Sequence, residues 1–295
     1  FVIEITASFS LTSAKTVGAG KYVKLVSSGG STFTLTRGST SVNMFNVQGS
    51  LILENIILDG ASWNTTYNMV NVSSGAAFTM GAGSVLQKAS LTSESGGSAV
   101  YNQGTFHLNG GVIQNNNVPS ISGIMPLTGG VIYNAGIFNM TAGSITGNQA
   151  ISGGSDIYYV NGGVVYNSSG AALTMSGGII GGDGADANTA TAQNSGVLSG
   201  GAVYNAGTFV MNGTALIKGN RARELTALPP YGSVCGGAVY NSGTFTMAGS
   251  AEISGTNGDI QNSSVSGVGV YSTGASAHFT MQDNAKISGN HGTAG

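Results

Sequence analysis

The sequence predicts an all-β fold: a single-stranded, right-handed parallel β-helix of about ten three-strand coils. Two observations support this prediction, a motif that returns at a nearly constant interval and short runs in which apolar and polar residues alternate. The interval is typical of solenoids, and alternation with a period of two indicates strands rather than helices. The right hand follows from the general preference of parallel crossovers.

The repeat is clearest at residues 200–213, which read Gly-Gly-Ala-Val-Tyr-Asn-Ala-Gly-Thr-Phe-Val-Met-Asn-Gly. A close copy begins at Gly236. Successive marker tyrosines are separated by 32, 33, 38, 36 and 31 residues, so we expect one coil per copy. These tyrosines are Tyr101, Tyr133, Tyr166, Tyr204, Tyr240 and Tyr271.

We expect one continuous domain over residues 1–295. Residues 1–68 form shorter, more aliphatic coils, and residues 69–295 carry the Tyr-Asn and Phe-x-Met repeats with long loops at one corner. No signal peptide is recognisable at Phe1, and the last repeat is cut short at Gly295. We therefore expect a fragment of a longer protein.

The first strand of each copy predicts which side chains face the core. Its first position is apolar in every copy, as at Val203, and therefore faces inward. The tyrosine that follows faces outward, and the next residue, Asn205 in this copy, faces inward at a corner. A column of inward asparagines should form a ladder in which each amide donates to the next.

The second and third strands supply the rest of the core. Phe209 and Met211 are separated by one variable residue, which predicts that both are buried while Val210 between them is solvated. The third strand carries an isoleucine, Ile217 in this copy, followed closely by Gly-Asn. The segments between Gly-Asn and the next Gly-Gly vary in length and are predicted to be loops.

Composition excludes several classes of function. Charged residues make up 7% of the chain and the net charge is −2, so we expect no nucleic-acid partner. No apolar run is long enough for a membrane helix, and no metal-ligand spacing is present. We predict no cofactor, no metal and no membrane insertion.

Several motifs resemble known repeats. They are Gly-Gly-Ala-Val at Gly200 and Gly236, Phe-x-x-Asn at Phe106 and Phe209, and Ile-Ser-Gly-Asn at Ile287. The first two resemble the repeats of chlamydial polymorphic outer-membrane proteins. The longer pattern resembles the pectin-lyase-like repeats of adhesin-like surface proteins of gut Gram-positive bacteria. The resemblance implies a β-helix, an extracellular location at the bacterial surface or after secretion, and an adhesive role.

The positions of the aspartates and glutamates indicate whether the protein could be a carbohydrate-active enzyme. Glycoside hydrolysis needs two carboxylates facing each other across a cleft, and no two acids occupy outward positions of one strand in adjacent coils. Arg221 and Arg223, the candidate bases of a lyase, have only Glu224 nearby in the sequence. We therefore predict a non-enzymatic module, with a polysaccharide lyase or glycoside hydrolase of the pectin-lyase-like fold as the alternative.

Two surfaces are candidates for binding a glycan or a protein of a host. The first is formed by the long loops, which differ between coils, and its residues are Tyr158, Tyr159, Leu228, Pro229, Tyr231, Arg221 and Arg223. The second is the outward column of the six tyrosines, which suits a repetitive polymer. The alternative for the loops is mutual packing, and for the tyrosines it is stacking on one another.

Overall fold

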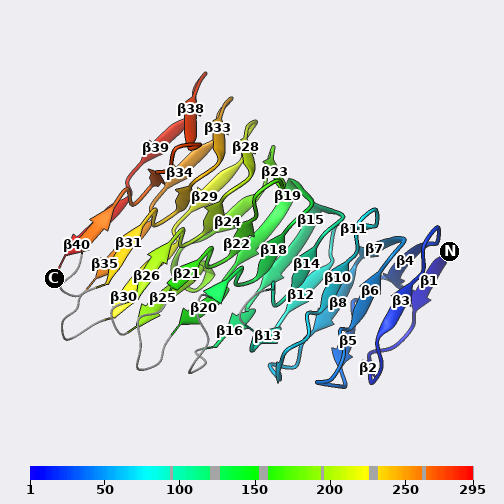
Figure 1. Cartoon of the computed structure of the whole chain (residues 1–295). Coiled ribbons are helices and arrows are strands. Elements are labelled where there is room, and N and C mark those ends of the chain that lie inside the picture. The colour runs from blue at the N-terminus through cyan, green and yellow to red at the C-terminus, as the bar shows by residue number, and fades with distance from the viewer. Residues whose placement is uncertain are drawn as a thin grey trace.

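The computed structural model describes residues 1–93, 96–119, 127–152, 159–193, 196–225, 232–260 and 264–294. Its strands follow one another in coils along one axis, from the blue N-terminal coils to the red C-terminal coils of Figure 1. Strands of equivalent position pair in parallel from coil to coil, as Val203–Asn205 does with Val239–Asn241. The predicted parallel β-helix is confirmed.

Nine three-residue strands form the tyrosine sheet. They are β3 (Lys15–Val17), β6 (Phe45–Val47), β10 (Val70–Val72), β14 (Val100–Asn102), β18 (Ile132–Asn134), β22 (Val165–Asn167), β27 (Val203–Asn205), β32 (Val239–Asn241) and β37 (Val270–Ser272). From β6 to β32, the first and third residues are buried and the middle residue is half-buried. The valines and asparagines therefore face inward and the tyrosines outward, as predicted.

The large sheet has 18 strands in two stacks. The first stack is β1 (Val2–Ile5), β4 (Tyr22–Ser27), β7 (Ser50–Glu54), β11 (Ala77–Met80), β15 (Thr105–Gln114), β19 (Ile137–Thr146), β23 (Ala172–Met175), β28 (Thr208–Met211), β33 (Thr244–Met247) and β38 (His278–Met281). The second stack is β2 (Phe9–Leu11), β5 (Phe33–Arg37), β8 (Ile56–Asp59), β12 (Val85–Gln87), β24 (Ile179–Gly181), β29 (Leu216–Lys218), β34 (Glu252–Ser254) and β39 (Lys286–Ser288). The long strands β15 and β19 pair with both stacks and join them.

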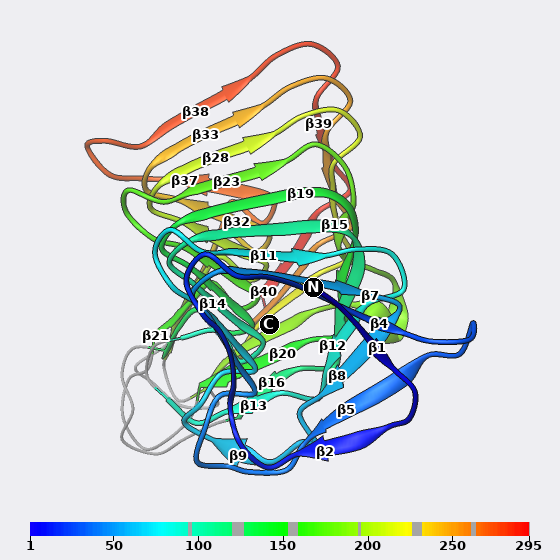
Figure 2. The same ribbon diagram turned by 90° about the vertical axis from the view of Figure 1, so that its right-hand side faces the viewer.

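Two further sheets follow in the coil. The polar sheet contains β9 (Asn64–Thr65), β13 (Ser90–Leu91), β16 (Asn117–Val118), β20 (Gln149–Ser152), β25 (Thr189–Gln193), β30 (Arg221–Leu225), β35 (Asn257–Ile260) and β40 (His291–Ala294). The short sheet contains β17 (Leu127–Thr128), β21 (Tyr159–Asn161), β26 (Val197–Ser199), β31 (Ser233–Cys235) and β36 (Ser264–Ser266). In the view of Figure 2, β13, β16 and β20 lie below β11, β15 and β19 of the first stack.

The prediction of three strands per coil is wrong for the later coils. The coil that begins at Val203 contains five strands, β27 to β31. Segments predicted to be loops form strands because small inward residues, such as Ala190 and Ala222, let the polar sheet pack against Leu198 and Val234 of the short sheet. The described part of the chain contains one helical element, the 3-10 helix η1 (Gly184–Asp186).

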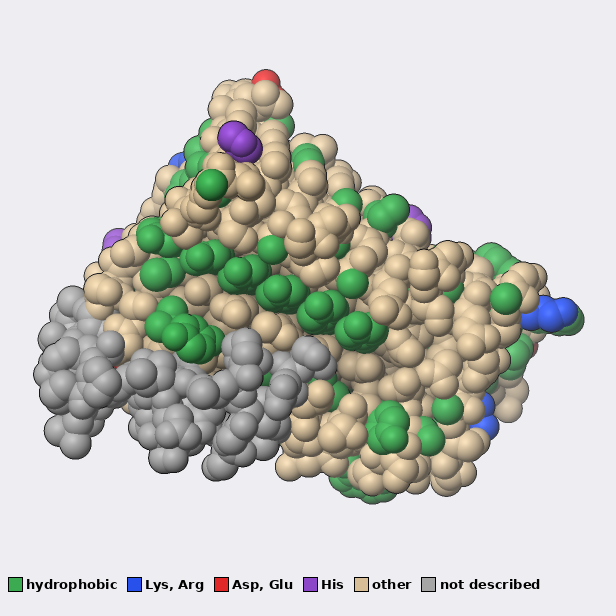
Figure 3. All heavy atoms as spheres, viewed as in Figure 1, with side chains coloured by type: hydrophobic (Ala, Val, Ile, Leu, Met, Phe, Trp, Pro, Cys, Tyr) green, Lys and Arg blue, Asp and Glu red, His purple; other side chains and the backbone are tan. Residues whose placement is uncertain are grey.

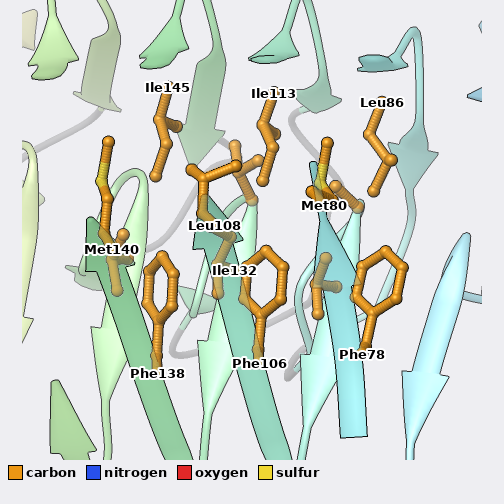
Figure 4. Packing of buried hydrophobic residues seen from close by; sticks show 14 of the residues in the cluster. Phe78, Met80, Leu86, Phe106, Leu108, Ile113, Ile132, Phe138, Met140 and Ile145 are labelled. Atoms are coloured by element: carbon orange, nitrogen blue, oxygen red, sulfur yellow. The ribbon is translucent and has the colours of Figure 1, made fainter. Parts of the chain in front are cut away.

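The main core lies between the large sheet and the tyrosine sheet. Phe78, Phe106 and Phe138 stack in adjacent coils with ring centroids 5.2 and 4.7 Å apart and are fully buried. Figure 4 shows them beside Met80, Leu108 and Met140 of the same strands, with Leu86 of β12 and with Ile113 and Ile145 from the later parts of β15 and β19 opposite. Since each coil buries its apolar residues against those of the next, the core continues along the rod.

The predicted asparagine ladder is present in the tyrosine sheet. The amide of Asn102 donates to Asn134 Oδ1 at 2.7 Å, and Asn134, Asn167 and Asn205 each donate in turn to the next asparagine at 2.7, 2.7 and 2.8 Å. Each of these asparagines is fully buried. The second amide hydrogen is satisfied by carbonyl oxygens of the adjoining strand, such as Thr208 O for Asn167, so the ladder leaves few buried donors unpaired.

A second asparagine ladder stands where the large sheet turns into the polar sheet. Asn116, Asn148 and Asn188 each donate to the asparagine of the next coil at 3.0 Å, ending at Asn220. The residue before the asparagine has a left-handed backbone in most coils, for example φ 63° at Gly147 and at Gly219, which explains the Gly-Asn pair of the repeat. This turn sets the direction in which each polar-sheet strand leaves the core.

The Gly-Gly pair closes the coil. Gly200 has φ 73°, a conformation that favours glycine. A Cβ at Gly201 would lie 2.3 Å from the carbonyl oxygen of Gly237 in the next coil. Both glycines are therefore required, one by its backbone conformation and the other by the close stacking of coils.

Candidate binding site

The outward face of the polar sheet carries the arginines predicted as site residues. Along β30, Arg221 is exposed and Arg223 is half-buried, whereas Ala222 and Glu224 between and beside them are buried. Successive side chains of a strand point to opposite faces, so both arginines point outward and Glu224 points inward. Glu224, the acid nearest to the arginines in the sequence, therefore lies on the opposite face of the strand.

Residues of the next two coils complete this site. Arg221 is in register with Asn257, which is in register with His291 of the following coil. Arg223 is likewise in register with Asp259, which is in register with Thr293. These six side chains line an open groove of about 470 Å³, which we call the polar groove.

Charge in the polar groove is unevenly paired. Arg223 Nε lies 3.4 Å from Asp259 Oδ2, and both side chains are about half exposed, so this ion pair adds little to stability. Among the described residues, no carboxylate lies within ion-pair distance of Arg221. The groove therefore keeps a positive guanidinium that is available to an anion.

The chain has one further arginine, and its role differs. Arg37 is buried and donates to the carbonyl oxygens of Val42 at 2.7 Å and Asn68 at 2.9 Å. Burial lowers the pKa of Arg37 to about 10. Arg37 thus holds the backbone together, whereas the other two arginines of the chain face solvent in the same groove.

The remaining predicted loop residues are only partly placed. Tyr159 begins β21, is 44% exposed and stands in register with Val197 of the next coil. Tyr158, Leu228, Pro229 and Tyr231 lie outside the described residues. The apolar patch expected from these five residues therefore stays a prediction.

The six marker tyrosines form one stacked column across the tyrosine sheet. From Tyr101 to Tyr240, neighbouring ring centroids are 4.8 to 5.2 Å apart with interplanar angles of 10 to 20°. The pair of Tyr240 and Tyr271 is tilted by 36°. Figure 3 shows a row of hydrophobic side chains crossing this face. The stacking alternative is confirmed, because the ring faces cover one another and leave their edges exposed.

The stacked column also affects the phenols. Burial, together with Tyr204 and Tyr133 on either side, raises the pKa of Tyr166 to about 12. Burial raises the pKa of Tyr133 and of Tyr240 in the same direction. The hydroxyl groups of these three tyrosines are therefore neutral at physiological pH.

Comparison with known proteins adds no family to this description. No family model, curated protein or solved structure matches this chain. Within the described ranges, no helix has the length and apolar character to cross a membrane.

The groove offers limited means for catalysis. Among the described residues, Asp259 is the one carboxylate that lines it, and this carboxylate is already paired with Arg223. Four other described acids form ion pairs with lysines of adjacent coils, including Asp183 with Lys218 at 2.6 Å and Glu54 with Lys24 at 2.5 Å. No three His, Cys, Asp or Glu side chains gather into a metal-binding group in the described part of the chain.

Four residues of the polar groove were missed by sequence reasoning: Asn257, Asp259, His291 and Thr293. They were missed because the segment after Asn220 was interpreted as a loop, which has no register. A signal was nevertheless present. Ala222, Gly258 and Gly292 occupy equivalent positions after the turn that recurs in each coil, and this small-residue alternation would have aligned the three strands.

Proposed function

We propose that the protein is a non-enzymatic, extracellular β-helical stalk or adhesion module of a bacterial surface protein, which binds a glycan or a protein of a host. One observation carries this proposal. Positions that build the rod repeat from coil to coil, whereas the outward positions of the polar sheet change in every coil. A repeating scaffold that displays a changing surface is typical of repeat proteins that bind.

The chemistry of the polar groove supports binding over turnover. Hydrolysis of a glycosidic bond uses two carboxylates, and Asp259 is the single carboxylate among the described residues that line the groove. Its other side chains are donors with regular spacing, which suit recognition. The two asparagine ladders and the continuous core keep these donors at fixed positions along the rod.

The experiment is a paired assay on the full chain. The protein is incubated with host cells and with neutral and acidic polysaccharides, and both retained protein and released oligosaccharides are measured. Saturable retention without new reducing ends or unsaturated uronates is the expected result. Release of products above a heat-denatured control would contradict the proposal and favour a carbohydrate-active enzyme.

A further inference from the structure

We infer that the polar groove binds the carboxylate or sulfate groups of an acidic polysaccharide whose chain runs along the rod. This inference rests on the proposed binding function and specifies the class of ligand. The groove gathers two of the chain's three arginines and one of its three histidines, in a protein whose net charge is −2. Such local enrichment concentrates anions at one place on the surface.

The arginines suit oxyanions in particular. A guanidinium presents a planar fork of donors that matches a carboxylate or a sulfate with two parallel hydrogen bonds. Arg221 is exposed on the outer face, and the described chain offers no carboxylate to it. Arg223 is held by Asp259 at 3.4 Å, a long contact that a ligand oxyanion can replace.

The register of the sheet favours a linear polymer. Gln149, Thr189, Arg221, Asn257 and His291 form one outward row, one residue from each of five successive coils. Strands in a sheet are about 4.8 Å apart, so the row offers hydrogen-bonding groups at regular short steps along the axis. A polysaccharide with hydroxyls on every sugar can contact such a row repeatedly.

An acidic peptide fits this face less well. Peptides that lie on sheets usually add a strand at an edge and use backbone hydrogen bonds. The backbones of β30 and β35 are already paired with neighbours on both sides, so the face offers side chains alone. The described side chains that line the groove are all polar or charged, which favours a polar ligand over the apolar residues of a peptide.

The tyrosine column is a weaker site for sugars. A sugar ring packs on the face of an aromatic ring, and the faces in this column are covered by the neighbouring tyrosines at about 5 Å. Only the edges and hydroxyls remain exposed. The column therefore lacks the surface on which a sugar ring would stack.

The test measures binding of polygalacturonate, which carries carboxylates, heparin, which carries sulfates, and neutral dextran to the full chain by calorimetry. We expect binding to at least one acidic polymer, weakened by added salt, and none to dextran. Arg221→Gln and Arg223→Gln should each weaken binding about tenfold or more. Asp259→Asn should strengthen it several-fold, because it frees Arg223 and removes a like charge.

Lys21→Gln is the matched control, since it removes the same charge from an exposed position in an N-terminal coil. A loss equal to that of Arg221→Gln would overturn the inference in favour of general charge attraction. So would binding to dextran alone, or no binding to either acidic polymer. If host cells still retain the protein, those outcomes do not contradict the proposed function. The proposed function is contradicted only if neither host cells nor any of the glycans bind the protein.

Discussion

The tyrosine sheet and the polar sheet are built by the same register, yet they present different surfaces. The outward position of the tyrosine sheet is tyrosine in six successive coils, and these rings stack on one another. The outward row of the polar sheet runs through Gln149, Thr189, Arg221, Asn257 and His291, which differ from coil to coil.

The difference separates stability from recognition. Identical side chains at one level of each coil satisfy one another, as the tyrosines and the asparagines do, and thereby stiffen the rod. Unlike side chains form separate pairs, such as Arg223 with Asp259, and no continuous column among the described strands, which leaves donors such as Arg221 available to a ligand. We therefore expect substitutions on the repeating positions to change unfolding, and substitutions in the polar groove to change binding.

The largest effect is expected from the buried aromatic column. Phe245 is fully buried and stacks on Phe209 with ring centroids 4.5 Å apart. Phe245→Ala should lower the free energy of unfolding by about 3 to 5 kcal/mol, because it removes the ring and leaves a cavity. Denaturant unfolding measures the change. The adjacent, half-buried Thr246 is the control, and Thr246→Ala should cost well under about 1 kcal/mol. Equal effects of the two would contradict the inward assignment.

The next effect concerns the first asparagine ladder. Asn205 accepts from Asn167 at 2.7 Å and donates to Asn241 at 2.8 Å and Thr244 O at 3.0 Å. Asn205→Ala should cost about 2 to 3 kcal/mol, since several buried groups lose one of their partners. Asn139, in the outward middle position of β19, is the matched control, and its replacement by alanine should have an effect below about 0.5 kcal/mol. A similar small loss at Asn205 would mean that the ladder does not stabilise the rod.

A gain in stability is expected where the second ladder is broken. Thr256 occupies the ladder position between Asn220 and Asn290, and its buried Oγ1 has no hydrogen-bond partner among the described residues. Thr256→Asn should stabilise the protein by about 1 kcal/mol, because an amide there reaches both neighbours. Thr256→Val separates the causes: it removes the unpaired hydroxyl without adding an amide. A larger gain from valine than from asparagine would contradict the ladder explanation.

The smallest effect at neutral pH is expected for the hydroxyl of Tyr166. Its pKa of about 12 lies above the value of about 10 for tyrosine in an unfolded chain. The folded state therefore holds this proton more tightly, and stability falls as the pH rises from about 10 to about 12. Tyr166→Phe should change stability little at pH 7 and reduce the loss above pH 10. Unfolding curves at both pH values test this, and an unchanged alkaline loss would contradict it.

Much of the rod could be predicted from residue types alone. Val203, Tyr204, Asn205, Phe209 and Met211 all face as expected, because each type recurs at its position and burial of the whole column depends on it. The first asparagine ladder followed from the same reasoning. Because the same pattern recurs in many coils, the inward or outward assignment of each strand position does not depend on any single coil.

The polar and short sheets could not be predicted in this way. Their inward residues are small, such as Ala190 and Ala222, so the alternation does not show as a pattern of large apolar side chains. The polar groove depends on register between three coils, which joins Arg223 to Asp259 across 36 residues of sequence. The second asparagine ladder is also difficult to recognise in the sequence. In the coil that contains η1, Asn188 does not directly follow a glycine, so the Gly-Asn pair of several other coils is absent there.

The most direct test of the division between the two sheets is hydrogen exchange of the full chain with and without the acidic polymer that binds it. We predict slower amide exchange in β30, β35 and β40 when the polymer is bound, and unchanged exchange in β27, β32 and β37 of the tyrosine sheet. Protection of the tyrosine strands with no change in the three polar strands would contradict it.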